Sequence, residues 1–268
     1  MSGKMALQDV TFLLPVRLDS VVRLENLLLV TEYLRKNFQT NVLVLQAGDY
    51  ENGLLPKLLH KSVSYIFIED YDEVFYRTMY INLMVNQATT PMVAVWDADV
   101  IVPAAQIEEA VQSIRAGADV AYPYDGHFYD TSEIIREEYL KARRLSLLMR
   151  NTAKMRLIYG DDMKGGGFII NRDSYIRSGK ENEDFYGWGP EDFERFTRWT
   201  KLDYRISRVK GNLYHLTHER GGNSTFRSQK QKASTNRSYV RTLSCSKEEL
   251  QQRVLEWHEV SQGFASQG

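Results

Sequence analysis

The stretch VWDADVIVP, residues 95–103, places two aspartates at the end of an apolar run. Asp97 and Asp99 are two residues apart, so on a β-strand both side chains would point to the same face. Two neighbouring carboxylates repel, and each then resists ionising. A divalent cation relieves this repulsion, and hard oxygen ligands suit magnesium or manganese. Because D-x-D alone is a weak signal, a pair of solvated turn aspartates is the alternative.

Two histidines in LYHLTHER, residues 213–220, are further candidates for metal ligands. His215 and His218 are spaced H-x-x-H, and imidazole together with carboxylate can hold manganese. No glutamate follows the first histidine, so the motif is not that of a zinc protease. The alternative is that both histidines are polar surface residues.

The stretch FYGWGPEDF, residues 185–193, combines two carboxylates with an aromatic ring between glycines. A carboxylate such as Asp192 can accept the proton of an attacking hydroxyl. Glu191 and Asp192 follow Pro190, a favoured first-turn residue, so complementing a helix dipole is the alternative role. Glycines on both sides of Trp188 suit a hinge that moves the ring, although a core tryptophan is also open.

An alternation of strands and helices is predicted to position these residues. The strands are expected at 10–16, 41–48, 64–70, 91–102 and 118–124. The helices are expected after Asp19 or Ser20, over 73–88, over 104–116 and over 132–155. Beyond them, 165–173 and 203–216 are predicted to be strand-like and 190–199 helical. This order predicts a parallel α/β sheet, in which ligands bind beyond the carboxyl ends of the strands.

Composition narrows the class of protein. The chain has 268 residues, 43% hydrophobic and 26% charged, which is enough for one large domain. A net charge of −1 favours neither nucleic acid nor a membrane as partner. No apolar run has the length of a membrane span, and no secretory signal is evident. The single Cys245 fits a reducing compartment, so we expect a cytoplasmic protein that is at most peripheral at a membrane.

Three more motifs carry a resemblance to a known family. LLPVR (13–17), FYRTMYIN (75–82) and KGGGFIINRD (164–173) join those above, and G-W-G-x-E-D is the most specific. Over roughly residues 8–225 the chain resembles the β-1,4-galactosyltransferase family, and more broadly GT-A glycosyltransferases that use nucleotide sugars. The resemblance implies a GT-A fold, a mixed and mostly parallel α/β sheet flanked by helices. It implies one domain, 1–268, with a nucleotide-binding half (8–125), an acceptor and metal half (126–240) and a tail (241–268).

The resemblance also implies roles for single residues. The donor site would be formed by Pro15, Arg17, Phe75, Arg77, Asp97, Gly166 and Trp188. The ligands of Mn²⁺ or Mg²⁺ would be Asp99, His215 and His218. The acceptor would contact Tyr186, Trp188 and Glu191, with Asp192 as the catalytic base. The family often has methionine at the place of His215 and a further aspartate at the place of Phe193.

The activity implied is metal-dependent, inverting transfer of galactose, N-acetylgalactosamine or a similar hexose. The donor would be a UDP-sugar and the acceptor a saccharide or glycolipid, in polysaccharide or glycan synthesis. The basic segment 219–235 is predicted to form a lid over the donor, or else a solvated loop. The alternatives are a sugar nucleotidyltransferase, whose glycine-rich loop LLPVRLDS lacks, an inactive glycan-binding scaffold, and a retaining transferase with the same WG-x-E theme.

Overall fold

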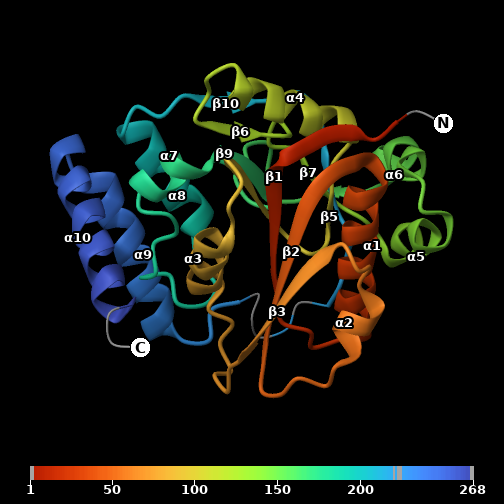
Figure 1. Ribbon diagram of the computed structural model, residues 1–268, viewed down its shortest axis with the longest axis horizontal. Helices are drawn as coiled ribbons and strands as arrows, with labels where there is room; N and C mark the ends of the chain where they lie inside the picture. Colours follow the sequence, from red (N-terminus) through yellow and green to blue (C-terminus); the bar gives the residue numbers. More distant parts are fainter. Residues whose placement is uncertain (1–2, 220, 222–224, 266–268) are drawn as a thin grey trace.

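A seven-stranded, mostly parallel sheet forms the centre of the protein (Figure 1). The computed structural model describes residues 3–219, 221 and 225–265, with the backbone alone for 258–265. In spatial order the strands are β10 (Ile206–Arg208), β6 (Val120–Tyr122), β9 (Gly167–Asn171), β4 (Met92–Trp96), β1 (Met5–Val16), β2 (Phe38–Gly48) and β3 (Val63–Glu69). Only β9 runs antiparallel to its neighbours in this sheet. The predicted fold class, a mixed α/β sheet of the GT-A type, is confirmed.

A second, four-stranded sheet lies beside the first. Its order is β5 (Val100–Ile101), β11 (Leu213–His215), β7 (Phe128–Asp130) and β8 (Arg156–Leu157). β11 pairs in parallel with β7 and antiparallel with β5. This register sets His215 opposite Asp130 on one side and Val100 on the other.

Helices cover both faces of the large sheet (Figure 1). α1 (Val21–Asn37) lies on one face and α3 (Arg77–Gln87) on the other, while α4 (Ala104–Arg115) packs on β6 and β9. The predicted start of α1 is confirmed, because the Ser20 hydroxyl accepts a hydrogen bond from the Arg23 amide at 3.3 Å. Within the described residues, no helix combines the length and apolar character needed to cross a membrane.

The expected strand 91–102 is wrong as a single element. β4 ends at Trp96, and β5 begins at Val100 in the other sheet. The chain turns between them because the Asp97 amide donates to the Gly166 carbonyl at 3.0 Å and the Val100 amide to the Asp97 carbonyl at 3.3 Å. Asp97 and Asp99 therefore lie on a turn that joins two sheets, and not on one face of a strand.

Two expected helices also differ from the structure. The helix predicted over 73–88 begins at Arg77, because the carboxylates of Asp70 and Asp72 bind the amides two residues ahead, each at 2.9 Å. The long helix predicted over 132–155 is divided into α5 (Glu133–Ala142) and α6 (Leu145–Asn151), followed by the turn η1 (Thr152–Lys154). Arg143 takes a left-handed conformation, with φ of 49°, and ends α5.

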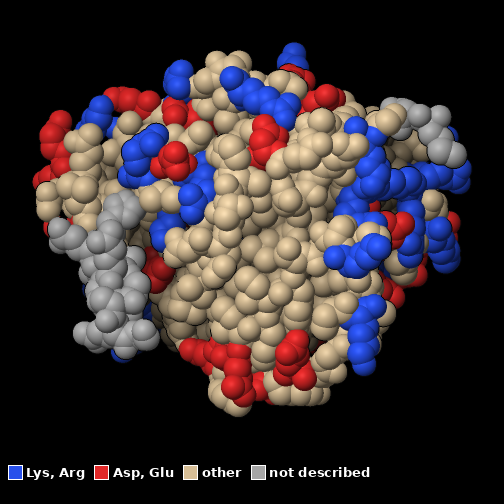
Figure 2. Space-filling view, viewed as in Figure 1, with Lys and Arg blue, Asp and Glu red and all other residues tan. Residues whose placement is uncertain are grey.

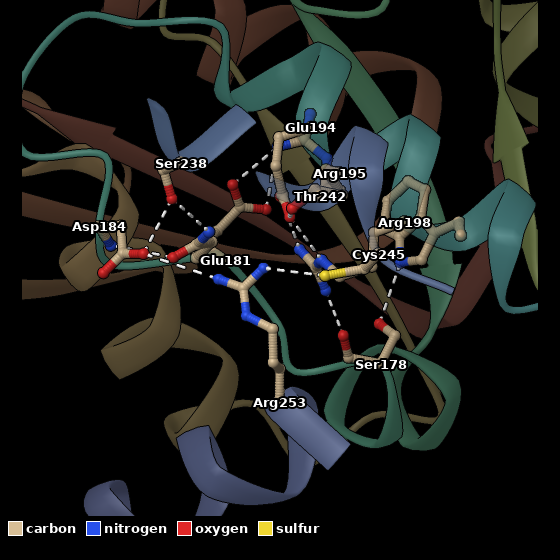
Figure 3. Close-up of polar contacts among 12 residues, drawn as sticks. Ser178, Glu181, Asp184, Glu194, Arg195, Arg198, Ser238, Thr242, Cys245 and Arg253 are labelled. Atoms are coloured by element: carbon tan, nitrogen blue, oxygen red, sulfur yellow. Dashed lines mark hydrogen bonds and ion pairs between the residues drawn. The ribbon is translucent and has the colours of Figure 1, made fainter. Parts of the chain in front are cut away.

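The segment after residue 228 is helical, which the sequence did not predict. α9 (Gln229–Ser244) and α10 (Lys247–Ala265) follow the proposed lid, so its second half is a helix rather than a loop. α9 packs on α8 (Glu191–Lys201) through a buried polar network (Figure 3). In this network Glu194 binds Arg198 at 3.1 Å and accepts from the Thr242 hydroxyl at 2.9 Å. The strand-like stretch 203–216 is also divided, with Gly211 at φ of +131° between β10 and β11.

Candidate active site

One cavity of about 480 Å³ collects the residues that the sequence singled out. It opens where β1 and β4 end, and the small sheet, α8 and the loop before α8 form its other walls. The predicted site residues that line it are Pro15, Arg17, Phe75, Arg77, Asp97, Asp99, Gly166, Trp188, Glu191, Asp192, His215 and His218. Segments separated by up to two hundred residues in the chain therefore meet at one place.

Tyr186 is the predicted site residue that lies outside this cavity. Its hydroxyl donates to the carboxylate of Asp72, and its ring packs edge-on against Tyr76 with centroids 5.1 Å apart. The Tyr186 carbonyl accepts a hydrogen bond from the Gln231 side chain at 2.7 Å. Tyr186 thus links the loop before α3 to the start of α9.

Asp99, His215 and His218 form a compact cluster of possible metal ligands. One ligand atom from each lies within 4.8 Å of the other two. The Asp99 carboxylate is 3.1 Å from His218 Nε2 and 3.7 Å from His215 Nε2. Two imidazoles and one carboxylate on one side of a cation leave its other positions open to ligand oxygens.

The outer nitrogens of both histidines are held by oxygen acceptors. His215 Nδ1 donates to the Asp130 carboxylate at 2.8 Å, and His218 Nδ1 donates to the Glu219 carbonyl at 2.7 Å. Each hydrogen bond fixes the ring with Nε2 toward Asp99, as the partners of metal-bound histidines do. The cluster therefore fits a divalent cation in its donor atoms and in the orientation of its rings.

Electrostatics in the cluster also favour a cation. Burial lowers the pKa of His215, but the carboxylates of Asp99 and Asp130 outweigh it and raise this pKa to about 9. Burial raises the pKa of Asp99, but the two histidines outweigh it and lower that pKa strongly. Positive charge next to Asp99 is thus stabilised, whether protons or a metal ion provide it.

Asp97 faces arginine rather than the histidines. Arg77 donates to the Asp97 carboxylate at 2.5 Å, while burial and the nearby charge of Asp99 raise the pKa of Asp97. Arg17 is held by the carboxylate of Asp70 and by the Asp72 carbonyl, the latter at 2.6 Å. Buried Nη1 of Arg77 and Nε of Arg17 have no hydrogen-bond partner within the described residues. Both guanidinium groups therefore keep a donor for an anionic ligand.

Glu191 and Asp192 open α8 with different surroundings. Arg195 donates to Asp192 Oδ1 at 2.5 Å, and Gly165 leaves room for Asp192 Oδ2, since a Cβ there would lie 2.4 Å from it. Glu191 Oε2 is buried without a hydrogen-bond partner within the described residues. Burial and Asp192 raise the pKa of Glu191 to about 8, although Arg77 opposes them. The pair thus provides one oriented carboxylate and one that is readily protonated.

Trp188 is part of the cavity wall and not of the core. Its side chain is 37% exposed, and its ring meets Phe226 edge-on with centroids 4.6 Å apart. Arg227 next to Phe226 binds the Glu73 carboxylate at 2.8 Å, so the expected lid already contacts the loop before α3. Arg220, another cation of that lid, lies outside the described residues.

A family model for the "Glycosyltransferase like family 2" matches residues 14–261. The chain belongs to this family. It is a glycosyltransferase, and the match spans the strand ends, the cavity and both terminal helices. Among curated proteins, no sequence match was found.

Solved structures of GT-A glycosyltransferases share the fold at low sequence identity. The catalytic domain of Drosophila β1,4-galactosyltransferase 7, in complex with xylobiose, is 16% identical with a TM-score of 0.54, over 87% of this chain and 79% of that one. A mannosyltransferase from Pyrobaculum calidifontis, in complex with GDP-Man and Mn²⁺, is 16% identical with a TM-score of 0.50. That match covers 80% of this chain and 58% of the mannosyltransferase, so this chain spans less than two thirds of that protein.

Sequence analysis missed Asp130 and Arg195, which hold His215 and Asp192. Arg195 could have been found, because it stands three residues after Asp192 on a predicted helix. Asp130 gave no such signal, since it ends a three-residue strand whose partner lies 85 residues away.

Proposed function

We propose that this glycosyltransferase moves a hexose from a UDP-sugar to a saccharide or glycolipid acceptor, with inversion at the anomeric carbon. The hexose is galactose, N-acetylgalactosamine or a close relative, as the G-W-G-x-E-D motif of the β-1,4-galactosyltransferases suggests. The observation that carries the proposal is the position of Asp192 in the same cavity as the Asp99–His215–His218 cluster. A metal site for a diphosphate and a base for an acceptor hydroxyl are thus combined.

The donor site would extend over two adjoining cavities. A second cavity of about 380 Å³ shares Arg17 and Asp19 with the first and lies at the ends of β1, β2 and β3. Gln46 and Asp49 in its lining offer hydrogen-bond partners to the polar edge of a nucleobase. The base would lie there, and the diphosphate would lie between Arg17, Arg77 and the metal cluster.

The bonds exchanged in the reaction assign a role to each group. The acceptor oxygen forms a bond to the anomeric carbon, the bond from that carbon to the diphosphate oxygen breaks, and Asp192 takes the hydroxyl proton. Mn²⁺ or Mg²⁺ held by Asp99, His215 and His218 would supply positive charge against the leaving diphosphate. Arg77 adds its unpaired Nη1, and Arg195 keeps Asp192 aimed into the cavity.

Two further parts of the proposal rest on fewer observations. A cytoplasmic location is supported by the single, unpaired Cys245. A sugar nucleotidyltransferase is disfavoured, because β1 is followed by Arg17, Leu18 and Asp19 rather than by a glycine-rich phosphate loop. A role in polysaccharide or glycan synthesis follows from the proposed acceptor class.

The proposal is tested with a panel of nucleotide sugars, with and without manganese and with simple saccharide acceptors. We expect release of UDP and a product of inverted anomeric configuration, with little of either in EDTA or in Asp99→Ala. Thermal unfolding of Asp99→Ala, compared with the parent, controls for loss of fold. Binding of UDP-sugars without transfer to any saccharide would support the scaffold alternative, and a retained anomer would refute the inverting mechanism.

A further inference from the structure

A strongly basic segment lies between α5 and the cavity. Residues 141–157, KARRLSLLMRNTAKMRL, contain six lysines and arginines and no acidic residue, although the whole chain has a net charge of −1. We call residues 141–157 the basic segment. Lys and Arg side chains gather over α5 and α6 in the space-filling view (Figure 2).

The cations of the basic segment face solvent. Arg144, Arg150 and Lys154 are exposed, and no ion pair joins them to an acidic group within the described residues. Arg156 binds Asp130 at 3.2 Å, but its side chain remains 73% exposed. The fold therefore leaves most of this charge available to an external anionic surface.

Apolar side chains are interleaved with these cations. Met149 is 53% exposed and Leu157 is 39% exposed, whereas Leu148 and Met155 are buried and attach the segment to the core. Exposed apolar residues between cations are typical of surfaces that lie in a membrane interface. A soluble polyanion would be bound by the cations alone and gives no reason to expose Met149 and Leu157.

The basic segment leads directly to the active-site cavity. Ile158 and Tyr159, the next two residues, line that cavity. The Tyr159 ring also packs edge-on against Phe128, with centroids 6.0 Å apart. An extended surface that contacts the basic segment would therefore lie beside the cavity opening.

We propose that the basic segment is a docking surface for an anionic lipid bilayer. The six cations would be attracted to acidic headgroups, and Met149 and Leu157 would enter the interfacial layer. Docking would hold the cavity next to acceptors that are anchored in the membrane. The inference goes beyond the proposed function, because the docking itself needs neither donor nor metal.

Vesicle co-sedimentation of the full chain tests the inference without any substrate. The vesicles are phosphatidylcholine alone or phosphatidylcholine with one third phosphatidylglycerol. The test variant is Arg144→Gln/Arg150→Gln/Lys154→Gln. The matched control removes three exposed arginines of α7 and α9, Arg177→Gln/Arg237→Gln/Arg241→Gln, far from α5 and α6 in Figure 1. Far-ultraviolet circular dichroism verifies that each variant is folded.

We expect the parent and the control variant to sediment with the acidic vesicles and not with neutral ones. The test variant should bind about 100-fold less tightly, from roughly fivefold for each charge near the surface. A second variant, Met149→Ser/Leu157→Ser, should weaken binding and leave its salt dependence unchanged. The inference is overturned if the parent ignores acidic vesicles, if test and control variants bind alike, or if the parent binds polyphosphate or heparin but no vesicle. Each of these outcomes is independent of whether the protein transfers sugar.

Discussion

Arg195 offers a perturbation whose effects on stability and on catalysis can be separated. Its side chain and that of Glu181 are each 1% exposed, and they form an ion pair at 2.7 Å. Arg195 also binds Asp192 at 2.5 Å. Replacing Arg195 by methionine would leave the Glu181 carboxylate buried without its cation, which costs about 3–5 kcal/mol in the free energy of unfolding.

A second substitution removes the uncompensated charge. In Glu181→Gln/Arg195→Met the buried carboxylate is absent, and the Tyr175 hydroxyl can still bind residue 181. We expect this double variant to regain most of the lost stability, because no isolated charge remains in the core. Asp192 would still lack the partner that aims it, so transfer should stay on the order of 100-fold slower than in the parent.

Urea unfolding and transfer rates at saturating donor and manganese separate the two effects. We predict a large stability loss in the single variant, its recovery in the double variant, and slow transfer in both. If the double variant recovers its rate together with its stability, Arg195 supports the fold and does not position Asp192. If Arg195→Met costs less than about 1 kcal/mol, the account of the buried ion pair is wrong.

Three further predictions follow from the site. Asp130→Asn should weaken manganese binding by about 10–100-fold in calorimetric titration, because His215 loses the carboxylate that orients it; Asp130→Asn binding at parental affinity would contradict this. The raised pKa of Glu191 means that the folded state loses stability as the pH rises from about 5 to 8, so Glu191→Gln should exceed the parent in free energy of unfolding by about 2 kcal/mol at pH 9 and by little at pH 5; equal pH profiles would refute it. UDP-sugar with manganese should change tryptophan fluorescence only when given together, and Trp188→Phe should abolish this change; an unaltered response would assign it to another tryptophan.

The large sheet and the outline of the site could be predicted from the sequence. Strands 10–16, 41–48 and 64–70 are continuous apolar runs, and such runs show a buried parallel strand without tertiary information. Asp99 and the two histidines are of the residue types that bind metals, and they meet in the structure. The chemistry of these residues was therefore visible before their geometry was known.

Other features depend on contacts between distant segments. The break after Trp96 follows from the hydrogen bond between Asp97 and Gly166, which no local pattern encodes. The amphipathic character of α9 is weak, and the helix is held by Thr242 bound to Glu194 and Ser238 bound to Asp184 (Figure 3). Such helices are stabilised mainly by what they pack against, so the sequence alone gave no helix there.

The most direct test of the account is the transfer rate of Asp192→Asn. Asparagine keeps the size of aspartate but cannot accept a proton at neutral pH. Binding of the donor and of manganese should match that of the parent, because neither involves this carboxylate, and transfer should fall by about 100-fold or more. Transfer by Asp192→Asn at close to the parental rate would contradict the central claim that Asp192 is the base of a metal-dependent glycosyltransferase.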